Sequence, residues 1–146
     1  MTKDVILSIS GVQFEVNDEP TEVITGADYY FKNGRHFVTY EETVPETGET
    51  VKNLIKIDDT RVDVIKHGPQ SVHMVFEKDK KNVTCYNTPF GSLFIGIHTL
   101  QMQHSEDELN INTQIGYSLE INDAHVSDCR ISLNIKSKED KSFHLQ

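Results

Sequence analysis

Residues 109–121, Leu-Asn-Ile-Asn-Thr-Gln-Ile-Gly-Tyr-Ser-Leu-Glu-Ile, alternate between two kinds of side chain with a period of two. Successive side chains of a β-strand point to opposite faces, whereas the residues on one face of a helix recur every three or four positions. One face of this segment carries Leu109, Ile111, Thr113, Ile115, Tyr117, Leu119 and Ile121. The other face is polar apart from one glycine, so the segment predicts a long strand with a buried side and a solvated side.

The same alternation extends over most of the chain, with turn residues between the segments. Further strands are predicted at residues 51–57, 61–67, 71–77, 83–88, 93–103 and 126–137. Asn33 and Gly34 predict a tight hairpin between residues 29–32 and 35–40, because a type I′ turn needs a positive φ at both central residues. Near Gly11 the apolar positions change phase, which predicts a bulge or bend in the first strand.

The length of the predicted strands favours a closed sheet. Several of them reach ten or more residues, and short loops connect them, so consecutive strands are expected to lie side by side in a meander. Closure protects long strand edges from aggregation. We therefore expect residues 1–146 to form one all-β domain, a single closed antiparallel meander barrel of about eight to ten strands. A two-sheet sandwich is the alternative.

Composition and charge limit the partners and the compartment. The chain has 14 basic and 23 acidic residues, a formal net charge of −9, which disfavours nucleic acid and anionic membranes as partners. Its two cysteines, Cys85 and Cys129, have no paired spacing, and we expect both to be reduced and buried. No segment approaches the roughly 18 apolar residues of a membrane span, so the expected location is the cytoplasm.

The order of several local motifs resembles the YwiB-like family of uncharacterised bacterial proteins. The motifs are Val5-Ile6-Leu7-Ser8-Ile9, residues 26–30, Val38-Thr39-Tyr40-Glu41-Glu42 with Gly48, residues 64–68, Met74-Val75-Phe76, residues 86–91 with Thr88-Pro89-Phe90-Gly91, and Gly116-Tyr117-Ser118-Leu119. The resemblance covers nearly the whole chain and implies a calycin-like barrel, similar in shape to lipocalins and streptavidin, in a bacterial cytoplasm. It brings no activity. Relatives often carry Arg where this chain has Lys66, and the absence of Trp removes the tryptophan signatures of true lipocalins and biotin binders.

Motifs for catalysis are absent from the sequence. There is no Gly-x-Ser-x-Gly elbow and no glycine-rich phosphate loop. Glu41 and Glu42 are adjacent, but neighbours on a strand face opposite sides, so only one of the two can point inward. An inward carboxylate needs a partner for its charge, and Lys66 or Arg61 can supply one. We expect no catalytic residue and no cofactor.

Seven histidines raise the question of a metal site, but their spacing does not predict one. No His-Glu-x-x-His pattern and no His/Cys cluster is present. His98 and His104 lie about 20 Å apart along an extended strand, too far to share an ion. Other histidines meet only if the fold brings distant segments together: His36, His67, His73 and His125. We therefore expect no metal site.

The barrel interior is filled either by its own side chains or by a ligand. Tyrosine and threonine at inward positions are candidates for a pocket, because a buried hydroxyl needs a hydrogen-bond partner. The candidate ligand-binding residues are Tyr40, Glu42, Lys66, Tyr86, Thr88, Phe90, Thr99 and Tyr117. Ordinary core packing is the alternative for these tyrosines, and a structural corner is the alternative for the Thr-Pro-Phe-Gly motif.

A second surface comes from the segment at residues 93–103, which is apolar on both faces. Phe94, Leu100 and Met102 are assigned to its outer face and are the candidate interface residues. The favoured function is non-enzymatic binding of a small, largely apolar molecule. The alternative is a homodimeric or partner-binding module with a filled core, and an enzyme of unknown type is third.

Overall fold

The computed structural model describes residues 3–13, 17–43, 45–67, 72–88 and 90–138, with side chains left out at positions 12–13, 17–21, 72 and 86–88. This described part contains ten strands and no helix. The strands are β1 Asp4–Gln13, β2 Asn17–Lys32, β3 Arg35–Thr43, β4 Thr50–Ile57, β5 Arg61–His67, β6 Val72–Glu77, β7 Lys81–Thr88, β8 Gly91–Glu106, β9 Asn110–Ile121 and β10 Ala124–Ser137. Accordingly, no described helix is long and apolar enough to span a bilayer.

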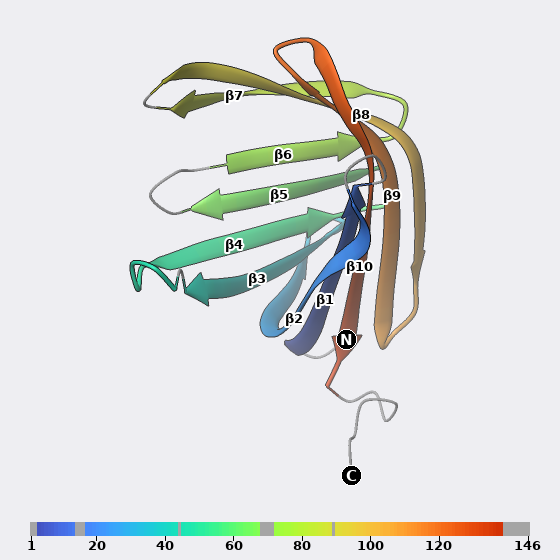
Figure 1. Ribbon diagram of the computed structural model, residues 1–146. Helices are drawn as coiled ribbons and strands as arrows, with labels where there is room; N and C mark the ends of the chain where they lie inside the picture. The colour runs from blue at the N-terminus through green and yellow to red at the C-terminus, as the bar shows by residue number, and fades with distance from the viewer. Residues whose placement is uncertain (1–2, 14–16, 44, 68–71, 89, 139–146) are drawn as a thin grey trace.

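The described strands form one antiparallel sheet in the order β6-β5-β4-β3-β2-β1-β10-β9-β8-β7. Consecutive strands are neighbours, and β1 joins β10, with Val5 opposite Ser137 and Gln13 opposite Cys129. The sheet therefore ends at β6 and β7, which follow each other in the chain. Figure 1 shows the sheet curling until β7 and β8 lie over β6. This nearly closed meander barrel confirms the predicted calycin-like fold class.

The barrel closes without a backbone ladder between β6 and β7 in the described residues. At one end, Asp79 N donates to Thr99 O at 3.0 Å and Thr99 N donates to Lys80 O at 3.1 Å. Further along, the Thr84 hydroxyl donates to the carbonyl of His73 on β6 at 2.8 Å. The predicted closure is thus achieved by turn and side-chain contacts instead of strand pairing.

Local sequence signals account for the hairpins and for the two faces of the strands. Asn33 and Gly34 have φ values of 53° and 77°, as the predicted type I′ turn requires. On β9, Ile111 and Ile115 are buried while Gln114 is exposed, which confirms the alternation in residues 109–121. The buried apolar side chains form a core that includes Val5, Leu7, Val38, Ile55, Ile57, Val62, Phe76, Ile97, Leu133 and Ile135.

Register shifts interrupt the pairing of the described strands at three places. One lies between Gly11 and Gln13, where the sequence predicted a bulge. Another lies between Thr99 and Gln101, so Leu100 is an extra residue in β8. An extra residue reverses which side chains face inward. Met102 is therefore buried in the core, and its assignment to the outer face was wrong.

The cysteines occupy different environments. Cys129 on β10 is buried, as expected, whereas Cys85 on β7 is exposed, so the prediction of burial was wrong for Cys85. Cys85 lies opposite Phe94 in the pairing of β7 with β8. β7 is the last strand in the strand order, so it pairs with β8 alone among the described strands.

Candidate functional site

A cleft opens where the sheet changes direction between β2 and β3. These two strands pair only from Asp28 opposite Thr39 to Lys32 opposite Arg35. Beyond that point β2 stays with β1 and β3 stays with β4, and Figure 1 shows the two groups running in different directions. The cleft has a volume of about 650 Å³ and is lined by Asp4, Gly26, Ala27, Asp28, Thr39, Tyr40, Glu41, Lys52, Asn53, Leu54, His67 and Lys138.

Tyr40 and Asn53 are the buried polar residues of this lining. They face each other in the pairing of β3 with β4, and Asn53 in turn faces Lys66 on β5. Asn53 Nδ2 donates to Glu42 Oε1 at 2.9 Å, and Lys66 Nζ lies 3.5 Å from the same oxygen. Lys66 is thus a partner of Glu42, as the sequence analysis anticipated for an inward carboxylate. Both charged side chains are partly exposed, so this ion pair lies at the end of the barrel.

The two buried groups differ in what they offer a ligand. Burial, together with the nearby carboxylate of Glu42, raises the pKa of Tyr40 to about 12. The Tyr40 hydroxyl therefore stays protonated and is a hydrogen-bond donor at neutral pH. Asn53 Oδ1 is buried and accepts no hydrogen bond from any described residue. A buried acceptor without a donor is costly, and a bound molecule with a donor group would satisfy it.

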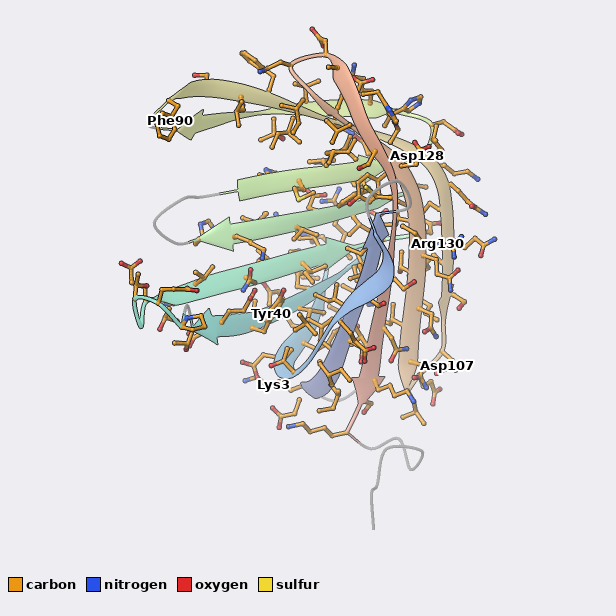
Figure 2. The ribbon with its side chains drawn as sticks, in the orientation of Figure 1. Lys3, Tyr40, Phe90, Asp107, Asp128 and Arg130 are labelled. Carbon is orange, nitrogen blue, oxygen red and sulfur yellow. The ribbon has the colours of Figure 1, made fainter. Side chains whose placement is uncertain are left out.

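The other sequence-predicted ligand residues lie elsewhere. Thr99 and Tyr117 face each other on β8 and β9, and Tyr117 packs edge-on against Phe76 with ring centroids 5.0 Å apart. Burial and the neighbouring Cys129 raise the pKa of Tyr117. Phe90 is fully exposed, and Figure 2 shows it at the tip of the β7–β8 hairpin, away from Tyr40. The side chains of Tyr86 and Thr88 lie outside the described part of the chain.

The structure therefore brings together Tyr40, Glu42 and Lys66 and adds Asn53, which the sequence analysis missed. A signal was present, because Asn53 continues the inward alternation of Ile55 and Ile57 and is the polar member of that row.

The candidate interface is reduced to Phe94 and Leu100, whose exposed fractions are 50% and 54%. Met102 is buried and cannot contribute to an outer surface. Self-association through the remaining two residues stays a prediction.

A second polar cluster joins β3 to β8, apart from the residues that line the cleft. His36 on β3 and His104 and Glu106 on β8 place one ligand-type atom each within 4.8 Å of one another. No sequence pattern indicated this group, because His36 is far in the chain from His104 and Glu106. Two imidazoles and a carboxylate are a donor set suited to a transition-metal ion.

The fold and the cleft define a nearly closed, antiparallel β-barrel with a polar opening at the corner of its sheet. Residues 7–133 match the model of a domain of unknown function, DUF1934, and the chain belongs to this family, in agreement with the YwiB-like resemblance. A solved structure, "Crystal structure of ywiB protein from Bacillus subtilis", is similar with a TM-score of 0.75 and 22% identity over 92% of each chain. At that identity the likeness concerns the fold. No curated protein matches the chain.

Proposed function

We propose that this protein binds a small polar molecule in the cleft beside Tyr40 and does so without catalysing a reaction. The observation that carries the proposal is that two complementary groups line one cleft. The Tyr40 hydroxyl is protonated and can donate a hydrogen bond, and Asn53 Oδ1 is a buried acceptor without a donor. Its volume of about 650 Å³ lies within the usual range for small-molecule sites. One group donates a hydrogen bond and the other accepts one, which fixes the orientation of a ligand.

The lining favours a polar ligand over the largely apolar one expected from the sequence. The apolar positions of the barrel are packed against one another in the core. The cleft, by contrast, carries carboxylates from Asp4, Asp28 and Glu41. Lys52 and Lys138 supply opposite charges. A molecule with both an amino and a carboxyl group, such as an amino acid or a dipeptide, matches this mixture of charges.

The test is a thermal-shift screen of amino acids and dipeptides against the wild type, Tyr40→Phe and Tyr30→Phe. Tyr30 is a matched control because it is a half-exposed tyrosine on β2 that is stacked on Phe37 outside the cleft lining. We expect at least one compound to raise the Tm of the wild type and of Tyr30→Phe. Loss of one buried hydrogen bond should weaken its binding to Tyr40→Phe by about tenfold.

Two results would count against the proposal. One is a screen in which no compound stabilises the wild type, combined with native mass spectrometry that finds no bound molecule on protein purified from its own host. The other is a stabilising compound that binds Tyr40→Phe and the wild type equally well, because binding would then not involve the cleft.

A further inference from the structure

The cluster of His36, His104 and Glu106 joins two strands that are not neighbours in the sheet. β3 and β8 are separated by β2, β1, β10 and β9 in the strand order, so their side chains meet across the interior. The side chains of His36 and His104 are only 12% and 10% exposed, whereas Glu106 is 47% exposed. We propose that these three residues bind one divalent transition-metal ion, with Zn²⁺ as the representative case.

The geometry of the three donors supports this assignment. Nε2 of His104 lies 3.3 Å from Glu106 Oε2, and Nε2 of His36 contacts the same oxygen. Ligands bound to zinc at about 2.0–2.1 Å in a tetrahedral site lie about 3.3 Å from one another. The three atoms, all within 4.8 Å of one another, therefore need only small side-chain rotations to surround an ion. The exposure of Glu106 leaves the remaining coordination position open to water.

Both histidines are held by a hydroxyl group on the ring nitrogen that faces away from Glu106. The Tyr29 hydroxyl lies 2.7 Å from Nδ1 of His36, and Thr113 Oγ1 lies 2.9 Å from Nδ1 of His104. Metal-binding histidines usually donate their second ring N–H to a hydrogen-bond acceptor such as a carboxylate, a carbonyl or water, which fixes the tautomer and the orientation of the ring. Because a hydroxyl both donates and accepts, Tyr29 and Thr113 accommodate the tautomer that leaves Nε2 free to bind a metal.

The competing explanation is a metal-free hydrogen-bond network in which both Nε2–H groups donate to Glu106. The two explanations differ in a measurable way. Imidazole and carboxylate ligands favour Zn²⁺ and Co²⁺ over Mg²⁺ and Ca²⁺, which prefer sites built from oxygen atoms. A hydrogen-bond network binds none of these ions with a fixed stoichiometry. Selectivity and stoichiometry together therefore decide between the two explanations.

The experiment uses full-length protein without an affinity tag, stripped with a chelator and then titrated with Zn²⁺ by calorimetry and with Co²⁺ by visible absorption. We expect one equivalent of either ion to bind, and no comparable binding of Mg²⁺. His36→Gln, His104→Gln and Glu106→Gln should each weaken binding at least about tenfold. His125→Gln is the matched control, since its Nε2 lies 3.2 Å from the Asp128 carboxylate at the surface, and it should bind like the wild type.

Nuclear magnetic resonance of the wild type provides a readout that does not depend on the folding of any variant. Zn²⁺ should shift the ring resonances of His36 and His104 and leave those of His125 in place. The proposal is overturned if the wild type takes up no stoichiometric Zn²⁺ or Co²⁺, if Mg²⁺ binds equally well, or if the shifts fall on other histidines.

Discussion

At the scale of single residues, Asp63 on β5 is a buried carboxylate with hydrogen-bonding partners on two residues, Arg61 and His73. Asp63 is 3% exposed. Its carboxylate accepts hydrogen bonds from Arg61 Nε at 2.7 Å and from Arg61 Nη2 at 3.0 Å. It also lies 2.8 Å from Nε2 of His73. Burial by itself would raise its pKa, but the hydrogen bonds from Arg61 and His73 outweigh burial and hold the pKa of Asp63 below its ordinary value. The ionised form is therefore favoured by folding.

This arrangement predicts a pH-dependent cost for Asp63→Asn. A carboxyl group with a lowered pKa in the folded state stabilises the fold above its unfolded pKa, and that stabilisation is lost as the pH falls through the folded pKa. At pH 7 the free energy of unfolding should fall by about 1–3 kcal/mol, the cost of losing hydrogen bonds to a charged group. The difference from the wild type should shrink below about pH 4. Urea unfolding at several pH values measures it.

Asp128→Asn is the control for this prediction, because Asp128 also contacts a histidine but is more than half exposed. Its effect should stay within about 0.5 kcal/mol. A difference between Asp63→Asn and the wild type that persists unchanged at low pH would show that the charge of Asp63 is not what stabilises the fold.

At the scale of elements, the bulge in β8 decides which residues face the core. Without the extra residue Leu100, the alternation that turns Ile95 and Ile97 inward would turn Met102 and His104 outward. The bulge therefore both completes the core with Met102 and turns His104 toward His36. A single local irregularity thus links packing to the proposed metal site.

The bulge predicts that substitutions at two nearby positions in β8 change the free energy of unfolding by very different amounts. Met102→Ala should lower the free energy of unfolding by about 2–4 kcal/mol, because it leaves a cavity in the core. Leu100→Ala should change it by no more than about 0.5 kcal/mol, because Leu100 is 54% exposed. Chemical denaturation of both variants measures the difference. Equal costs for the two substitutions would mean that β8 alternates without interruption.

At the scale of the whole molecule, the seam between β6 and β7 is the least tightly joined part of the described sheet. The other neighbouring strands share backbone ladders, whereas this seam depends on contacts such as the hydrogen bond from the Thr84 hydroxyl on β7 to the carbonyl of His73 on β6. Side-chain contacts of this kind break individually, and backbone ladders break cooperatively. The barrel should therefore open first along this seam.

Thr84→Val tests the seam with little change of shape. It removes the hydroxyl that donates to His73 O, so we expect a loss of about 1 kcal/mol and faster amide exchange in β6 and β7 than in β1 and β10. Thr25→Val is the control, because the Thr25 hydroxyl donates to the carbonyl of the adjacent residue, Gly26, within the same strand β2. Uniformly faster exchange over all strands would contradict a local seam.

The sequence by itself determined the features that depend on neighbouring residues. The alternation in residues 109–121, the Asn33-Gly34 hairpin and the irregularity near Gly11 act over a few positions, and the structure confirms each of them. Short connections then place consecutive strands side by side, which is why the antiparallel meander was also predictable. The inward direction of Tyr40 follows from the same alternation. For an inward carboxylate the sequence offered Lys66 or Arg61 as a partner, and the structure pairs Glu42 with Lys66.

Only the tertiary structure decided which residues meet across the barrel. The extra residue at Leu100 carries no local signal such as glycine or proline, yet it moves Met102 and His104 inward. The meeting of His36 with His104, and the cleft where β2 leaves β3, depend on the curvature and register accumulated over the whole sheet. Alternation specifies the face of the sheet on which a side chain lies. The twist and register of many strands together specify which side chain it meets across the barrel.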